Sequence, residues 1–150
     1  MKFFKIYVIA AILLTSIPIF SDDNKLSIKM NDVEYLSRWS KDTLFEFTPK
    51  GQEDLKTWTD MISITPFNTV KKPEELTEVS KKLFNAYQQL KNAPIKFYSL
   101  PKDSAEPNEH IIIVLLITPE YIECVFARLM FHEKQGLAII YSHKVYGGKA

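Results

Sequence analysis

The chain has 150 residues, 46% hydrophobic and 25% charged, a composition typical of a folded protein and not of a disordered one. Its 19 basic and 18 acidic residues nearly balance, which argues against nucleic-acid binding because that function requires a concentrated basic surface. The single cysteine, Cys124, excludes an internal disulfide, so packing has to stabilise the fold.

Residues 1–21 have the pattern of a secretory signal peptide. Two lysines give a basic start, residues 6–20 form an apolar run, and Ser21 is the small residue before the expected cleavage site. The pattern predicts export, most naturally to the periplasm, and a mature chain of residues 22–150 folded as a single domain. Without the leader, 17 basic and 18 acidic residues remain, a net charge of −1 that argues against a polybasic membrane-binding patch.

An uncleaved anchor is the alternative to a cleaved leader. The apolar run is shorter than the ~20 residues that comfortably span a bilayer, and a proline interrupts it. Lipid attachment is disfavoured, because it would need a cysteine at the cleavage site and Cys124 lies far from it. We therefore expect no membrane span in the mature chain.

Alternating apolar residues predict a β-hairpin between residues 33 and 47. A three-residue turn at Ser40–Asp42 would place Tyr35 opposite Phe47. The same alternation places Trp39 in the core.

The next stretch predicts less regular structure. Residues 52–59 predict a short helical turn, and residues 61–70 favour an extended segment in which Pro66 indicates an edge or a bulge.

Residues 73–91 predict an amphipathic helix. Pro73 suits the first helical position, and the two glutamates that follow suit the positive end of the helix dipole. Glu78 and Lys82 are expected to pair on the solvent side. The apolar stripe that would face a sheet consists of Leu76, Val79, Leu83, Phe84, Tyr87 and Leu90.

Four strands follow the helix. Residues 95–100 form the first, and residues 110–117 contain seven consecutive apolar side chains, which predicts a strand covered on both faces. Residues 121–132 and 137–146 would form a final hairpin around a four-residue loop at 133–136. The fold class predicted is α+β: an antiparallel sheet with one main helix packed on it, an N-terminal hairpin and a C-terminal meander.

Candidate binding residues gather on the last two strands. Arg128 and His132 share a face of one strand, and Tyr141 and His143 share a face of the next. The four-residue loop would set Arg128 opposite Tyr141 and Phe126 opposite His143. This arrangement would form a cationic pocket for an anionic ligand, with Arg128 as a two-pronged donor.

Each candidate also has a structural interpretation. Arg128 could cover apolar surface at the sheet rim or pair with a carboxylate such as Glu46. Cys124 could act as a thiol nucleophile beside a histidine, but a buried cysteine that packs as a small hydrophobe is the simpler expectation. Trp58 could be a partly exposed interface anchor or could fill the seam between helix and sheet.

The sequence contains no catalytic or phosphate-binding motif, and its three histidines have no metal-ligand spacing. No metal or cofactor is therefore predicted. The polar loop at residues 101–108 is a further candidate binding element.

Three segments resemble small exported bacterial proteins of uncharacterised function: residues 45–52, residues 58–64 and the Tyr-x-x-x-x-Tyr-Gly ending at Gly147. The order of elements is similar to the PsbP/Mog1/DcrB-like sandwich. That resemblance implies a binding or assembly accessory and not an enzyme, and it transfers no catalytic residues.

The sequence therefore predicts an exported, non-catalytic binding or accessory protein whose partner is another protein or an envelope component. One alternative is an inhibitor or immunity protein that inserts the 101–108 loop into a toxin or hydrolase. A second alternative is a small periplasmic hydrolase that uses Arg128, His132 and His143.

Overall fold

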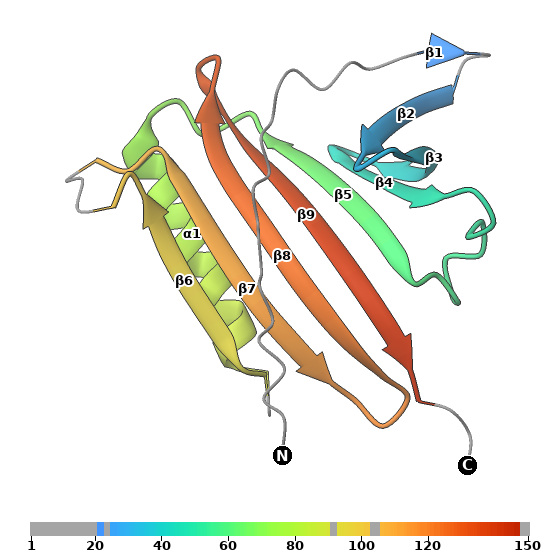
Figure 1. Cartoon of the computed structure of the whole chain (residues 1–150). Coiled ribbons are helices and arrows are strands. Elements are labelled where there is room, and N and C mark those ends of the chain that lie inside the picture. Colours follow the sequence, from blue (N-terminus) through green and yellow to red (C-terminus); the bar gives the residue numbers. More distant parts are fainter. Residues whose placement is uncertain (1–20, 23–24, 91–92, 103–105, 148–150) are drawn as a thin grey trace.

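A computed structural model describes residues 21–22, 25–90, 93–102 and 106–147 (Figure 1). The expected leader, residues 1–21, lies outside the described residues except for its last residue. The described chain forms one antiparallel sheet in the order β1-β2-β3-β4-β5-β9-β8-β7-β6, with one helix, α1. The expected α+β class, an antiparallel sheet carrying one main helix, is confirmed at this level. The bounds are β1 Ser21–Asp22, β2 Lys25–Met30, β3 Val33–Lys41, β4 Leu44–Pro49, β5 Asp60–Phe67, α1 Pro73–Gln88, β6 Ile95–Leu100, β7 Glu109–Ile117, β8 Tyr121–His132 and β9 Gln135–Tyr146.

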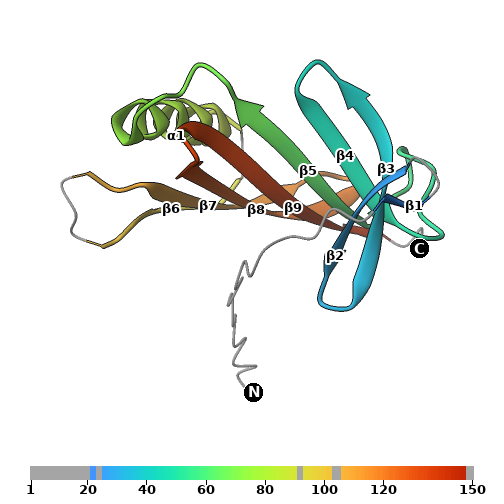
Figure 2. The same ribbon diagram turned by 90° about the horizontal axis from the view of Figure 1, so that it is seen from above.

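Helix α1 covers one face of the sheet over strands β6–β9 (Figure 2). Its apolar stripe faces the sheet as expected, with Leu76 fully buried, whereas Leu90 lies beyond the helix end and is 47% exposed. Glu78 pairs with Lys81 at 3.3 Å and not with Lys82, because positions three and four residues apart both adjoin it on the helix surface. The core under the helix contains Val70, Leu76, Ile112, Val114, Val125, Ala127, Leu129 and Ala138.

Strand β7 is covered on one face only, so the expectation of cover on both faces is wrong. His110, Ile112 and Val114 are buried beneath α1. The alternate residues, such as Ile111 and Ile113, point to the other face and remain half-buried. The sheet has one helix to cover it, and that helix can shield only one of its faces.

The β3–β4 hairpin forms, but its register differs from the expected one. Its turn has two residues, beginning with Asp42 at φ 54°, and a β-bulge lies between Ser37 and Trp39. Phe47 consequently pairs with Ser37, while Tyr35 pairs with Pro49. The extra residue at the bulge reverses the alternation, so Trp39 is 40% exposed and does not lie in the core as predicted.

A second hydrophobic cluster lies on the face of the sheet opposite α1. Figure 2 shows the β2–β3 hairpin projecting on that side. Its tight turn uses Asn31 and Asp32, both with positive φ. The cluster buries Ile28, Tyr35, Phe47 and Ile62, with Met30, Phe45, Ile64, Ile139 and Tyr141 packed against them.

The segment before β5 is a turn and not a helix. Thr57 N–H donates to Asp54 O at 3.1 Å, and no further helical bond continues it, so the expected helical turn at 52–59 is wrong. Pro66 pairs with Leu137 on β9, beyond the part of β5 that pairs with β4. Its missing N–H therefore faces no described strand, which agrees with the expected edge position.

Candidate functional site

The β8–β9 hairpin carries all the predicted site residues except Trp58. Its turn has two residues, Glu133 and Lys134, at φ 48° and 63°, and not the expected four. The register therefore differs by two residues from the predicted one. A shift of two preserves the faces, because side chains alternate with a period of two. Arg128 now lies opposite Ile139, Phe126 opposite Tyr141, and Cys124 opposite His143.

Arg128 is bound by a carboxylate of the neighbouring strand. Its Nε and Nη2 each donate at 2.7 Å to the two oxygens of Glu109, and the two side chains are 20% and 18% exposed. The expectation that Glu46 pairs with Arg128 is wrong, because Glu46 lies on β4 opposite Trp39. The two-pronged donor that an anion pocket requires is thus satisfied within the sheet.

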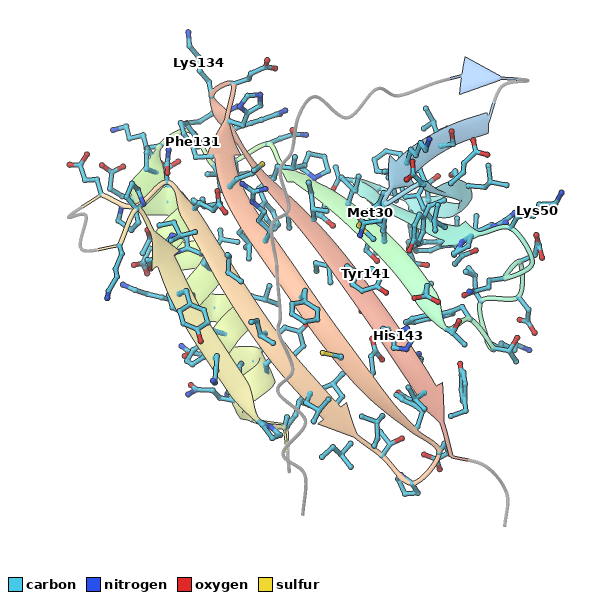
Figure 3. The ribbon with its side chains drawn as sticks, viewed as in Figure 1. Met30, Lys50, Phe131, Lys134, Tyr141 and His143 are labelled. Atoms are coloured by element: carbon cyan, nitrogen blue, oxygen red, sulfur yellow. The ribbon has the colours of Figure 1, made fainter. Side chains whose placement is uncertain are left out.

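His132 does not join the other candidates. It is exposed at the end of β8, where its Nε2 lies 3.5 Å from Glu133 Oε1. Eight residues separate it from Cys124, which corresponds to ~27 Å along a strand. Figure 3 shows Lys134, in the turn that follows His132, at the hairpin tip and His143 toward the opposite end of β9.

Tyr141 and His143 converge on Asp60, the first residue of β5. Tyr141 donates its hydroxyl proton to Asp60 Oδ1 at 2.7 Å, and His143 Nδ1 lies 2.9 Å from the same oxygen. Thr59 Oγ1 donates to Asp60 Oδ2 at 2.9 Å, and Gln52 Nε2 donates to it at 3.3 Å. We call Asp60, Tyr141 and His143 the Asp60 cluster.

The hydrogen bonds of the Asp60 cluster fix its charge state. Burial favours the neutral carboxyl, but the bonds from His143, Tyr141 and their neighbours outweigh burial and lower the pKa of Asp60 to about 2. Burial and the adjacent carboxylate both raise the pKa of Tyr141, which therefore stays a neutral donor. At neutral pH the cluster is a carboxylate held by two side chains of β9.

Sequence reasoning missed Asp60. Its role depends on the pairing of β5 with β9, which sets Asp60 opposite His143 and Ile62 opposite Tyr141 and so brings Tyr141 to Asp60 across 81 residues of sequence. A polar residue that opens an apolar strand was the available signal, but nothing in the sequence indicated which strand would lie beside it.

Trp58 is buried against β9, so it forms no exposed anchor, and it does not fill the expected seam between helix and sheet, because the cluster under α1 does not include it. It is 7% exposed, and Lys144 Nζ lies 3.9 Å from its ring centroid. The same ammonium lies 3.5 Å from Glu123 Oε2, and Tyr146 donates its hydroxyl proton to Trp58 O at 2.9 Å. The alternative of an interface tryptophan is therefore wrong.

Cys124 lies on the same face as His143 and directly opposite it. Such cross-strand pairs bring Cβ atoms to ~4.5–5.5 Å. Burial raises the pKa of the Cys124 thiol, so the neutral thiol is favoured over the nucleophilic thiolate. His143 contacts Asp60 through Nδ1, and its Nε2 has no hydrogen-bond partner among the described residues.

The remaining feature of this side of the molecule is an apolar surface. We call the face of β6–β9 opposite α1 the open face. Six of the nine exposed large apolar side chains of the described residues lie on it or on the adjoining face of the β2–β3 hairpin, the face that also carries Ile28 and Met30. The six are Tyr98, Ile117, Ile122 and Val145 on the sheet, and Leu26 and Val33 on the hairpin.

Half-buried apolar residues complete the open face. They are Ile111, Ile113, Leu115 and Phe126, which lie between the exposed residues along β7 and β8. Monomeric proteins rarely leave a large contiguous apolar surface uncovered unless it has an interaction partner.

No protein-family model matches the chain, and a search of curated proteins finds no significant match. In the described part of the chain, no group of three or more His, Cys, Asp or Glu side chains is placed to hold a metal ion. The helix in that part lacks the length and apolar character needed to cross a bilayer. The loop at 101–108 includes residues 103–105, which lie outside the described residues.

Proposed function

We propose that this chain is an exported, non-catalytic binding protein of the cell envelope, and that the open face is its binding surface. One observation carries the proposal: six of the nine exposed large apolar side chains of the described residues lie on the open face or on the adjoining face of the β2–β3 hairpin. Scattered apolar residues need no explanation, but a concentration of this kind is typical of an interaction site. The leader pattern of residues 1–21 supports export.

Capture of bound partners tests the proposal. The full chain, with its leader and a C-terminal tag, is expressed in bacteria, cross-linked in intact cells and recovered from the envelope and periplasmic extracts. Ile122→Lys places a charge on the open face, and Leu90→Lys places one at a site of similar exposure off that face (46% and 47%). We expect one defined partner, either a different protein or a second copy of this chain, to be cross-linked to the wild type and to Leu90→Lys but not to Ile122→Lys. Equal recovery with both variants, or no cross-linked species at all, would refute the proposal.

A small hydrolase is the second candidate, and the Asp60 cluster is the observation that favours it. A histidine oriented by a carboxylate at 2.9 Å, with a cysteine on the neighbouring strand, has the composition of a thiol-based site. Arg128 and His132 no longer belong to it, and the raised thiol pKa of Cys124 opposes it. Ester hydrolysis abolished by both Cys124→Ser and His143→Gln in folded protein would support this candidate, and an inactive wild type would exclude ester hydrolysis.

A further inference from the structure

We infer that the partner on the open face is a second copy of this chain. The inference rests on the proposed function, because it takes the open face as the binding surface and assigns what covers it. Three properties of that face support a second copy: its charges, its shape and its area.

The carboxylates of the open face and of the adjoining Asp60 cluster are satisfied within one copy. Glu109 is bound by Arg128, and the carboxylate of Asp60 accepts hydrogen bonds from Tyr141, Thr59 and Gln52. A facing copy would therefore bring no unpaired carboxylate into contact with this surface, and burial of unpaired charge is the main cost that forbids such contacts. Lys96 lies on edge strand β6, from which its long side chain can reach solvent.

The shape of the molecule is complementary to itself. Figure 2 shows β6–β9 as a layer with α1 on one side and the β2–β3 hairpin projecting from the far end on the other side. Two such L-shaped profiles fit together across a twofold axis that runs along the strands. Each hairpin would then lie beside the other copy's β6, with Leu26 and Val33 near the partner's Tyr98, all three of which are exposed in one copy. Two sheets would face each other at ~10 Å, as in a β-sandwich.

The area of the open face is adequate for a weak to moderate dimer. Four strands at ~4.8 Å spacing, each contributing about six residues, give a projected area of ~400 Å² for each copy. The exposed face of the hairpin adds to this value. A specific interface requires at least ~500 Å² from each partner, so the hairpin has to contribute ~100 Å² beyond the four strands.

Sedimentation or light scattering on the purified protein tests the inference. The protein is produced from the full chain, as the cell processes it, and measured over about 1–100 µM, a range in which a modest interface dissociates. We expect a concentration-dependent dimer. Ile122→Lys and Tyr98→Lys should each raise the dimer dissociation constant at least tenfold, as charged substitutions at a buried anchor do. Leu90→Lys, matched in exposure, should leave it within about twofold.

The use of two variants guards against misfolding, which a thermal melt of each detects directly. A wild type that stays monomeric at about 100 µM would overturn the inference. The inference would also be overturned if both open-face variants dimerised as tightly as Leu90→Lys. A monomer that is cross-linked to a different protein through the open face would refute the second copy while leaving the proposed function in place. A monomer that is cross-linked to nothing would refute both.

Discussion

Asp60 is the residue on which the hydrogen bonds of the candidate site converge. Its carboxylate is contacted by Tyr141 and His143 of β9 and by Thr59 and Gln52 of the segment before β5. Gln52 Oε1 also accepts the backbone N–H groups of Thr59 and Asp60 at 2.8 Å each. The carboxylate thus joins the start of β5 to β9 at the end of the open face. The hydrogen bonds of Asp60 therefore stabilise the fold, independently of any ligand that binds nearby.

Asp60→Asn should destabilise the protein at neutral pH by about 2 kcal/mol, at ~1.4 kcal/mol per unit of pKa shift. The pKa of Asp60 is lowered from 3.8 to about 2 by folding, so its contribution is present above pH 4 and is lost as the pH falls from about 4 to about 2. Urea unfolding at pH 7, 4 and 2.5 checks this: the difference between wild type and variant should shrink at the lowest pH.

Asp42→Asn is the matched control. Asp42 is exposed in the β3–β4 turn, where positive φ suits asparagine, and no hydrogen bond to its carboxylate is present among the described residues. Its effect should stay within ~0.5 kcal/mol. Identical pH profiles for both variants would show that the Asp60 cluster does not stabilise the fold.

Glu109→Gln and Arg128→Met, combined in a double-mutant cycle, test whether Arg128 is structural. The two-pronged contact at 2.7 Å and about 20% exposure predicts a coupling free energy of ~1.5–3 kcal/mol, less than the ~3–5 for breaking a fully buried pair. The exposed pair Glu78–Lys81 should give less than ~0.5 kcal/mol in the same cycle. Near-zero coupling between Glu109 and Arg128 would instead leave the guanidinium available to a ligand.

At the scale of elements, His110 joins α1 to β6 and β7. Its Nε2 lies 3.0 Å from Thr77 Oγ1 on the helix, its Nδ1 lies 3.0 Å from Ser99 Oγ on β6, and its ring stacks on Phe97. The side chain is fully buried. Both ring nitrogens are satisfied without a carboxylate, so the neutral ring suits this position.

His110→Gln should remove a pH dependence from stability. Burial, with Lys81 nearby, lowers the pKa of His110 below 6.5, so the folded state resists its protonation. The wild type should therefore keep its full stability above pH 6.5 and lose part of it as the pH falls below that value, whereas the variant should not show this loss. Unfolding free energies between pH 5 and pH 8 measure the difference.

Ser80→Ala provides the comparison within the same helix. Ser80 is fully buried, and its Oγ lacks a hydrogen-bond partner, so its removal should leave stability unchanged or raise it by ~1 kcal/mol. The pH dependence of the wild type should persist in this variant. Loss of that dependence in Ser80→Ala, or its retention in His110→Gln, would assign the titration to another group.

The elements themselves were predictable because their periodicities were strong, whereas the registers were not. The stripe around Leu76 and the alternation from Tyr121 to His132 identify a helix and a strand. Turn lengths fix register, and the turn at Glu133 and Lys134 carries neither glycine nor asparagine to reveal its positive φ angles. The bulge before Trp39 is likewise not marked in the sequence by any residue type that would predict its position. The side chains of β8 were still assigned to the correct faces of the sheet, because the register error there was an even number of residues. Trp39 was assigned to the wrong face, because the error there was odd.

At the scale of the whole molecule, one sheet is stabilised by two separate hydrophobic clusters. The larger lies under α1, and the smaller lies between the β2–β3 hairpin and the opposite face of the sheet. Strand β4 pairs with β5 only over Phe45–Phe47, whereas β5 pairs with β9 along its whole length. The N-terminal strands are therefore attached to the rest through a short stretch of backbone pairing and the smaller cluster.

This arrangement predicts that β2–β4 open before the rest of the sheet. Native-state hydrogen exchange should give lower opening free energies for the amides of Ile28 and Tyr35 than for those of Val125 and Leu129. Phe47→Ala, which removes a buried ring of the smaller cluster, should lower the opening free energies of both pairs by about 3 kcal/mol, because the contacts of this ring are lost in the local and in the global opening.

Leu129→Ala supplies the opposite case, because its contacts lie in the larger cluster, which stays folded when β2–β4 open. The substitution should lower the opening free energies of Val125 and Leu129 by ~2–5 kcal/mol and leave those of Ile28 and Tyr35 unchanged until the global value falls to theirs. If Leu129→Ala lowered all four equally, the sheet would unfold as one cooperative unit. A dimer through the open face would alter this pattern in a defined way, since it would cover the β2–β3 hairpin. Protection of the Ile28 and Tyr35 amides should then rise with protein concentration, while that of Val125 and Leu129, which exchange only through global opening, should rise at most equally.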